Sequence, residues 1–290
     1  MNTIYALGFF DGVHLGHQAL LTACRHLAER HGCSAGVVTF ATHPDALVTG
    51  QTPPLINTVD ERQRLILAYG SFHIAVLPFD EKLMKMPWQS FLEDLLQKGA
   101  AGFVCGEDFR FGHKGEGTAH ALAAFCKERG MPWAVVSSQE LNGIRISSTH
   151  IRQLLRAGDV ESANRFLGHS HMLSGKVIPG RGIGRTMGVP TANLQISEEI
   201  CLPRQGVYAC SALVDGQTHV AVTNIGSRPT VGGSHVTVEP WLLDFEGDLY
   251  GKILTLHFHK YLRPELKFET LEALKAQIRQ DAAQAFRLLR

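Results

Sequence analysis

Short apolar runs alternate with amphipathic stretches over the first 168 residues or so. The runs with the length and β-branched content of buried strands cover residues 4–8, 36–40, 73–77, 102–105 and 133–136. Between them, apolar residues recur at the i, i+3, i+4 spacing of helices that pack one face on a core. This alternation predicts an α/β domain with a doubly wound parallel sheet, whose strands are joined by crossover helices.

Several helix ends can be placed from local signals. The first helix is expected to begin near His17. The sequence Thr58-Val59-Asp60-Glu61 has the form of a capping box, and Pro87 suits the first turn of a helix over residues 88–98. Helical patterns over residues 148–156 and 160–167 close this half of the chain. We therefore expect a domain of residues 1–169 and a second domain of residues 170–290.

The second half has β-branched runs separated by glycines. Asp215-Gly216 lies between apolar runs 208–214 and 218–224 and is a strong hairpin signal. Two more runs, 236–245 and 253–259, precede a helical pattern over residues 271–288. These features predict a β-barrel or sandwich with a terminal helix.

Composition limits the choice of partners and location. Lysine and arginine total 28 against 27 acidic residues, and no run of like charge suggests a nucleic-acid surface. No apolar run reaches the length of a membrane span, and no signal peptide precedes the first strand. The six cysteines form no C-x-x-C pair. We expect a cytoplasmic protein with reduced thiols that binds neither nucleic acid nor membrane; these patterns indicate no oligomeric state.

The first strand ends in the sequence Gly8-Phe9-Phe10-Asp11-Gly12-Val13-His14-Leu15-Gly16-His17. Glycines let a backbone approach a phosphate closely, and a helix start at Gly16 and His17 would direct free N–H groups toward it. Two other interpretations are open. The stretch could be an ordinary tight turn with solvent-facing histidines, or Asp11, His14 and His17 could be metal ligands.

In this stretch the chain resembles the nucleotidylyltransferase superfamily. The wider sequence resembles the bacterial bifunctional riboflavin kinase/FMN adenylyltransferases, also called FAD synthetases. The matching segments occur in the family's order: residues 8–17, Thr39-Phe40 with His43-Pro44, residues 106–112 and residues 146–152.

The resemblance implies that His14 and His17 stabilise charge on ATP while the FMN phosphate attacks the α-phosphorus and pyrophosphate leaves. It implies ATP contacts from Gly8, Phe9, Asp11, Gly16, Ser147, Ser148, Thr149 and Arg152. It implies flavin contacts from His43, Pro44, Asp108 and Phe109. Taken alone, residues 147–149 could equally be an N-cap cluster, and Phe109 a core residue. Phe9 departs from the asparagine that the family often has there.

Residues 175–193 are rich in glycine and basic, as a flap over phosphates or a flexible surface loop would be. The P-loop pattern G-x-x-x-x-G-K-[ST] is absent. The sequence Pro190-Thr191-Ala192-Asn193 resembles the PTAN motif of riboflavin kinases, and residues 206–208, residues 224–230 and Glu239 follow it. The family likeness therefore extends over nearly the whole chain.

The likeness assigns ATP binding in this half to Gly180, Gly182, Gly184, Arg185, Thr191 and Asn193. It implies that Thr191 and Asn193 also bind Mg²⁺, since oxygen ligands suit a hard cation. Glu239 would be the base for the ribityl hydroxyl. A carboxylate inside an apolar run is unexpected unless it is paired or functional, although an outward-facing strand residue would look the same. Pro240 and Trp241 depart from the family's usual pattern.

We expect an enzyme that converts riboflavin to FMN and FMN to FAD, using ATP as co-substrate in both steps. Two alternatives stay open. The chain could retain one of the activities, or it could be a flavin-binding regulator without chemistry. A regulator would not need the residues proposed for catalysis, all of which are present: His14, His17, Thr191, Asn193 and Glu239.

Overall fold

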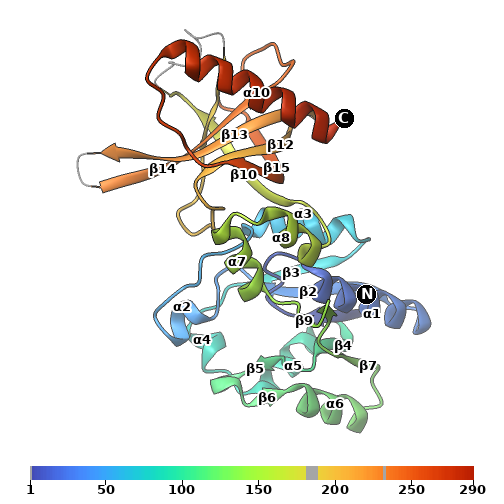
Figure 1. Ribbon diagram of the computed structural model, residues 1–290. Coiled ribbons are helices and arrows are strands. Elements are labelled where there is room, and N and C mark those ends of the chain that lie inside the picture. Colours follow the sequence, from blue (N-terminus) through green and yellow to red (C-terminus); the bar gives the residue numbers. More distant parts are fainter. Residues whose placement is uncertain (1, 181–188, 231–232) are drawn as a thin grey trace. The chain divides into compact units, whose positions relative to one another are not determined.

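The computed structural model describes residues 2–180, 189–230 and 233–290. By its contacts the chain divides into two compact units, residues 1–148 and 149–290 (Figure 1). The helices at 148–157 and 160–167, which the sequence analysis placed in the first domain, thus fall almost entirely in the second unit. The limits of the functional domains stay a prediction.

The first unit is built on a parallel sheet in the order β3-β2-β1-β4-β7. Its strands are β1 (Thr3–Leu7), β2 (Ser34–Phe40), β3 (His73–Leu77), β4 (Ala100–Gly106) and β7 (Trp133–Val136). The doubly wound parallel sheet expected from the sequence is confirmed. All the predicted strands are present, with ends shifted by up to two residues.

Helices cover both faces of this sheet, which is why its strands are apolar on both sides. Ile4 and Ala6 pack on α1, whereas Leu7 packs on α5 and α6. The helices are α1 (Leu15–Arg30), α2 (Asp45–Val48), α3 (Val59–Ala68), α4 (Glu81–Met84), α5 (Trp88–Gln97), α6 (Ala119–Glu128) and a 3₁₀ turn (His113–Gly115). Two small hairpins complete the unit, β5 (Arg110–Phe111) with β6 (Gly117–Thr118) and β8 (Glu140–Leu141) with β9 (Ile144–Arg145).

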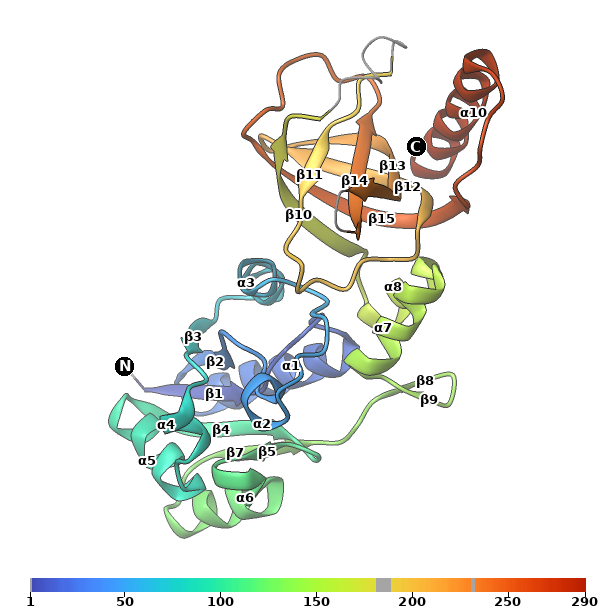
Figure 2. The same ribbon diagram turned by 90° about the vertical axis from the view of Figure 1, so that its left-hand side faces the viewer.

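The second unit contains a closed barrel in the order β10-β11-β14-β13-β12-β15. Its strands are β10 (His171–Ile178), β11 (Asn193–Gln195), β12 (Gly206–Val214), β13 (Gln217–Thr230), β14 (Gly233–Leu242) and β15 (Ile253–Arg263). The terminal helix α10 (Leu271–Leu289) lies along the outside of the barrel, against β12 and β13 (Figure 2). Helices α7 (Ser148–Ala157) and α8 (Val160–Leu167) precede β10. The expected β-barrel with a terminal helix is confirmed.

Turn chemistry explains where the barrel strands end. Asp215 and Gly216 both have positive φ, 50° and 78°, and form the predicted hairpin between β12 and β13. Strand β14 ends at Leu242 rather than at residue 245, and Asp244 with φ 57° lies in the turn that follows.

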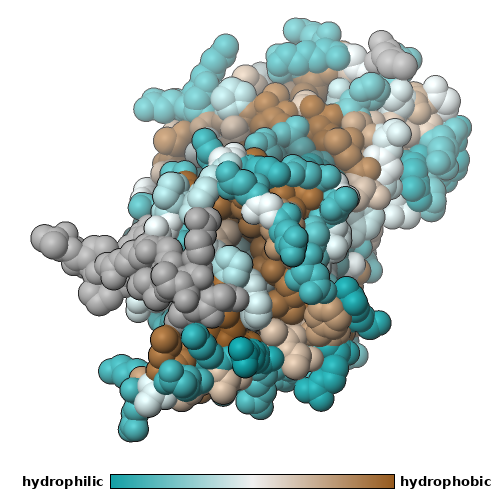
Figure 3. All heavy atoms as spheres, turned by 90° about the horizontal axis from the view of Figure 1, so that it is seen from above, coloured by the Kyte–Doolittle hydropathy of each residue, from teal (hydrophilic) through white to brown (hydrophobic). Residues whose placement is uncertain are grey.

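On the face drawn in Figure 3, hydrophilic side chains are spread widely, and apolar atoms gather in areas between them. Among the residues that the structure describes, each helix is too short or too polar to cross a membrane.

Candidate active sites

The turn between β1 and α1 has a strained backbone. Phe10, Gly12 and Val13 have positive φ angles of 60°, 82° and 39°. This region is unfavourable for side chains with a Cβ, and strain of this kind often marks functional loops. Phe10 and Val13 are fully buried in the core of the first unit. Their burial holds the turn in a conformation that the local sequence alone would not adopt.

Hydrogen bonds fasten the same turn to its surroundings. The Asp11 carboxylate accepts from the backbone N–H of Ile56 at 2.9 Å and of Asn57 at 3.2 Å. The Ser148 hydroxyl donates to the Asp11 carbonyl at 2.9 Å, and the Gln18 amide donates to the Val13 carbonyl at 3.0 Å. Asp11 is only 3% exposed. Its carboxylate therefore anchors the turn to the segment before α3.

His14 is the N-cap of α1. Its Nδ1 accepts from the backbone N–H of His17 at 3.3 Å, and the helix begins at Leu15, two residues before the predicted start near His17. The two imidazole rings stack, with centroids 3.7 Å apart and planes at 13°. A Cβ at Gly16 would lie 3.2 Å from the His14 ring, which explains the small residue between them.

His17 is neutral at physiological pH. Burial, then the neighbouring His14 and then Arg62 lower the pKa of His17 well below its ordinary value. Its Nδ1 is buried and has no hydrogen-bond partner among the described residues. The turn thus holds a neutral imidazole beside a helix N-terminus, an arrangement that can donate a hydrogen bond to an anionic group.

The other residues assigned to ATP fall in different places. Gly8 follows the last residue of β1, and a Cβ there would lie 3.0 Å from the Phe10 ring. The Phe9 carbonyl accepts from the Thr39 hydroxyl at 2.8 Å. Ser147 and Ser148 end the first unit, while Thr149 and Arg152 belong to α7 of the second.

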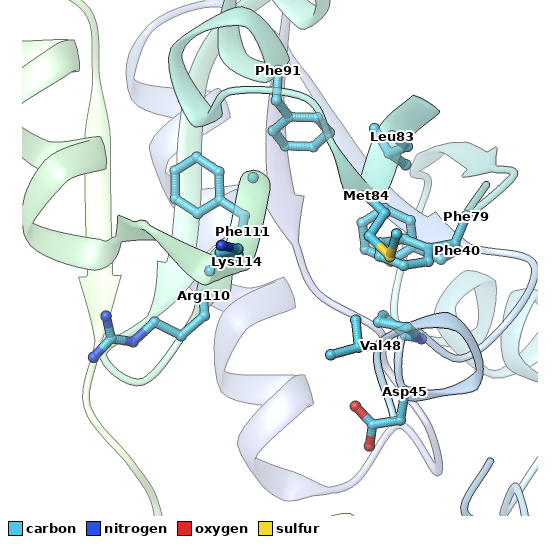
Figure 4. A pocket seen from close by; sticks show the side chains of 13 residues that line it. Phe40, Asp45, Val48, Phe79, Leu83, Met84, Phe91, Arg110, Phe111 and Lys114 are labelled. Carbon is cyan, nitrogen blue, oxygen red and sulfur yellow. The ribbon is translucent and has the colours of Figure 1, made fainter. Parts of the chain in front are cut away.

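A pocket of about 620 Å³ opens in the first unit, a volume typical of small-molecule sites. Figure 4 shows the rings of Phe91 and Phe111 on one side, and those of Phe40 and Phe79 with Met84 on the other. The remaining lining residues are Pro44, Asp45, Val48, Leu83, Arg110, Gly112, Lys114 and Gly115. Such aromatic walls suit a flat, apolar ligand.

Of the residues assigned to flavin, Pro44 lines this pocket. The His43 ring packs on Phe9 with centroids 4.6 Å apart, and Phe109 stacks on Phe111 at 5.4 Å. Asp108 is exposed and paired with Arg145. Sequence reasoning assigned no role to Phe79, Leu83, Met84 or Phe91. Arg110 and Phe111 could have been found, because they lie in the matching segment 106–112.

In the barrel, the polar residues Asn193, Glu239 and Asn224 form a row across three neighbouring strands. Leu194 pairs with Val238, and the Ala192 N–H donates to the Pro240 carbonyl at 2.8 Å. This antiparallel register sets Asn193 opposite Glu239. On the other side, Glu239 pairs with Asn224 of β13. The structure thus brings the PTAN segment and the proposed base together.

Hydrogen bonds orient two side chains of this row, Glu239 and Asn224. The Thr237 hydroxyl donates to Glu239 Oε1 at 2.8 Å. The Asn224 amide donates to Glu265 Oε1 at 3.1 Å, and a Cβ at Gly226 would lie 2.3 Å from that oxygen. Sequence reasoning missed Glu265, because its link to the row depends on the tertiary fold. A second carboxylate therefore lies close to the row.

The remaining kinase predictions fall near the row or outside the described residues. A Cβ at Gly180 would lie 2.1 Å from the Asn193 amide nitrogen, so the backbone there passes close to that side chain. Thr191 lines a small cavity of about 80 Å³ with Asp248 and Tyr250. Gly182, Gly184 and Arg185 lie outside the described residues. Among the described residues, no group of three or more histidine, cysteine, aspartate or glutamate side chains could hold a metal ion.

Comparisons with known proteins match a different family model to each half of the chain. A protein-family model described as FAD synthetase matches residues 1–150, and one described as riboflavin kinase matches residues 167–289. The bifunctional riboflavin kinase/FMN adenylyltransferase of Listeria monocytogenes is 33% identical over 97% of this chain and 90% of its own. The protein of the same name from Pseudomonas fluorescens is 36% identical over 97% of this chain and 91% of its own.

A solved structure is similar along nearly the whole chain. A Streptococcus pneumoniae protein described as a macrolide-efflux protein matches with a TM-score of 0.88 at 28% identity, over 97% of this chain and 93% of its own. The likeness shows that both domains share their folds with that protein. The name describes that protein only.

Proposed function

The chain belongs to the family of bifunctional riboflavin kinase/FMN adenylyltransferases, and we propose that it carries out both reactions. In the first, the terminal phosphoryl group of ATP passes to riboflavin, giving FMN and ADP. In the second, FMN attacks the α-phosphorus of ATP, giving FAD and pyrophosphate. The observation that supports this most strongly is the presence of two separate pairs of side chains, the stacked His14 and His17 in the first unit and the facing Asn193 and Glu239 in the second.

The first unit, together with Thr149 and Arg152 just after it in the sequence, supplies the groups proposed for adenylyl transfer. The turn before α1 holds the stacked His14 and His17 at a helix start, where phosphate groups are favoured. Neutral His17 has one ring N–H, which can donate a hydrogen bond to a phosphate oxygen. Ser147, Ser148, Thr149 and Arg152 are proposed to hold the outer phosphates, which suits hydroxyls and a guanidinium.

The aromatic pocket of the first unit is proposed to receive the isoalloxazine ring of FMN. Its walls are apolar, as a fused aromatic ring requires, and its volume fits such a ligand. Arg110 and Lys114 belong to its lining and bring positive charge close to the pocket. His43, Asp108 and Phe109 are proposed to contact the flavin next to the pocket.

The barrel supplies the groups for phosphoryl transfer. Asn193 and Glu239 lie opposite each other on β11 and β14, so an amide oxygen that can bind a metal ion lies next to a carboxylate. We propose that Thr191 and Asn193 bind Mg²⁺ together with the ATP phosphates. Mg²⁺ is usually held by few protein oxygens, by phosphates and by water, which fits a site without a dedicated carboxylate cage. When bound, the ion would neutralise charge on the transferred phosphoryl group.

Glu239 is proposed to accept the proton of the ribityl hydroxyl. Its Oε1 accepts a hydrogen bond from the Thr237 hydroxyl at 2.8 Å, which helps to orient the carboxylate. A general base must be held in a fixed orientation within reach of the hydroxyl that it deprotonates. Gly180, Gly182, Gly184 and Arg185 are proposed to cover the ATP phosphates.

One assay tests the proposal. Protein is supplied with riboflavin, ATP and magnesium, and FMN and FAD are separated by chromatography over time. FMN should appear first and FAD should follow. Formation of FMN alone, or conversion of supplied FMN to FAD alone, would favour an enzyme with one activity. Flavin binding without either product would favour a regulator. Cytoplasmic location stays a prediction.

A further inference from the structure

A fully buried arginine lies against the strained turn. Arg62 of α3 has no exposed surface. Its Nη1 donates to the Phe9 carbonyl and, at 3.0 Å, to the Thr39 hydroxyl. Its guanidinium carbon lies 4.2 Å from the centre of the Phe9 ring. Hydrogen bonding and stacking together need the planar fork of arginine, which lysine does not have.

The hydrogen-bonding capacity of this arginine is only partly used. Its Nε and Nη2 are buried without a hydrogen-bond partner in the part of the chain that the structure describes. Burial lowers the pKa of Arg62 to about 10, partly offset by the negative charge of Asp11, so the side chain is still a cation at pH 7. An incompletely bonded buried cation lowers stability, and an apolar residue would avoid that cost. Its presence therefore suggests a task beyond packing.

The charge of Arg62 acts on a proposed catalytic residue. Together with His14, it lowers the pKa of His17 beyond the effect of burial. The described groups that influence His17 are thus a stacked imidazole, the Phe10 ring at 5.1 Å and this guanidinium. A fixed cation favours a neutral His17 and raises the positive potential of the turn.

We propose that Arg62 is a positioning residue for the adenylyl-transfer step. It fixes the main chain of the turn at Phe9 and supplies an internal positive charge to the turn that binds the ATP phosphates. This inference rests on the proposed function of the first unit. It assigns a role to a residue that touches no substrate and acts through Phe9 and His17.

The test compares Arg62→Met, Arg62→Lys and a control, Arg64→Met, in the full chain. Arg64 is an exposed arginine on the same helix. Each variant is checked for folding by circular dichroism and assayed separately for FAD formation from FMN and for FMN formation from riboflavin. The His17 ring is titrated by NMR from about pH 8 down to the lowest pH at which the protein stays folded, because its pKa lies well below the usual histidine range.

Arg62→Met should lower kcat for FAD formation on the order of 10- to 100-fold, because a small displacement of the turn misplaces the reacting groups. FMN formation should stay near the wild-type rate. The pKa of His17 should rise, since the neighbouring cation is gone, and the acid limb of the FAD-forming reaction should move to higher pH. Arg62→Lys should slow FAD formation while leaving the titration of His17 close to that of the wild type. Arg64→Met should change neither.

A folded Arg62→Met protein with wild-type FAD formation would overturn the inference, as would an equal loss of both activities. If Arg62→Met does not fold, wild-type FAD formation by Arg62→Lys would overturn it instead. A lower rate with an unchanged His17 titration in Arg62→Met would refute the electrostatic part. Wild-type protein that forms no FAD would instead refute the proposed function, while the His17 titration would still show whether Arg62 acts on that residue.

Discussion

Glu239 allows the most direct test of the kinase proposal. Glu239→Gln keeps the size of the side chain and an oxygen that can accept from Thr237, but it removes the base. FMN formation should fall by roughly 10²- to 10⁴-fold, the usual contribution of a positioned base. Conversion of supplied FMN to FAD should be unchanged, because the first unit is intact. Steady-state assays of the two reactions measure both effects.

The control for this variant is Glu246→Gln, which removes an exposed carboxylate from the loop after β14. It should leave both rates unchanged. Wild-type FMN formation by Glu239→Gln would show that Glu239 is not the base of the kinase step. Substrate positioning by Thr191, Asn193 and magnesium would then be the better account of the kinase step.

His14 and His17 should affect the other reaction. His17→Ala removes a donor to phosphate oxygens, and such donors are worth on the order of 2.7–4 kcal/mol of transition-state stabilisation. FAD formation should therefore fall steeply, while FMN formation stays unchanged. His14 is also the cap of α1, so His14→Asn is a better test than alanine, because asparagine can cap the helix. Equal loss of both activities in a folded variant would contradict the assignment.

His171 makes the stability of the barrel depend on pH. It is fully buried, neither ring nitrogen has a described hydrogen-bond partner, and burial, with smaller effects of His169 and His257, lowers its pKa to about 3. The pKa of His171 is lower in the folded protein than in the unfolded chain, so the unfolded chain binds a proton first as the pH falls. The free energy of unfolding is therefore unaffected by His171 above about pH 6.5 and decreases as the pH falls from there toward 3. Within this range His171 should lower the free energy of unfolding by about 1.4 kcal/mol for each pH unit.

Urea unfolding followed by circular dichroism at several pH values measures this slope. His171→Phe keeps a ring against Phe258 and removes the titrating group, so the slope below pH 6.5 should become shallower. His26→Phe, a change at an exposed histidine of the first unit, should leave it unchanged. An identical slope in wild type and His171→Phe would attribute the acid sensitivity to other groups.

At the scale of single residues, the sequence indicated which residues belong to the site better than it indicated what each side chain does there. It indicated His14 and His17, because they lie in an ordered match to a known family. It did not reveal that the Asp11 carboxylate is bonded to the backbone before α3. Arg62 could not be found either, because the start of α3 has the charged composition of a solvent-facing helix turn. Which charged residue becomes buried is decided by tertiary packing.

At the scale of elements, two threonine caps allow a matched comparison. Thr58 caps α3 in a full capping box, and Thr270 caps α10 through the N–H of Ala273 at 3.2 Å. Replacing either by alanine should lower stability by about 1 kcal/mol. Because α3 carries Arg62, Thr58→Ala should also slow FAD formation, whereas Thr270→Ala should not. Thermal unfolding and the FAD assay measure the two effects, and equal FAD rates in the two variants would count against a role of α3 in the site.

Elements were predictable where local pattern and tertiary environment agree. The strands of the parallel sheet are apolar runs because both faces are covered, and the capping box of α3 and the Asp215-Gly216 hairpin have short-range signals. Strands β10 and β11 were not predicted. Strand β11 has only three residues, Asn193–Gln195, and the glycine-rich, basic segment 175–193 begins within β10 and resembles a loop; both segments are strands because they pair with their barrel neighbours. Helix α1 begins at Leu15, two residues before the predicted start near His17, because its N-cap is a histidine, which is an uncommon capping residue.

At the scale of the whole molecule, the kinase site should work without the adenylyltransferase site. The described kinase residues, Gly180, Thr191, Asn193 and Glu239, all lie after residue 170, so a fragment of residues 170–290 should still phosphorylate riboflavin if it folds. The structure adds a requirement. The Asn164 amide donates to the Phe258 carbonyl at 2.8 Å, and its oxygen accepts from the His171 N–H at 2.7 Å.

A fragment of residues 149–290 keeps α8, all of α7 except Ser148, and these bonds, whereas the shorter fragment leaves the two backbone groups without their partner. Each buried group left unpaired costs about 1–3 kcal/mol, so the shorter fragment should unfold at a lower temperature. The longer one should form FMN at a rate close to that of the full chain. Circular dichroism melts and the FMN assay measure both. A folded but inactive 149–290 fragment, beside an active full chain, would show that the barrel needs the first unit for catalysis. Equal melting temperatures of the two fragments would show that α7 and α8 contribute nothing to its stability.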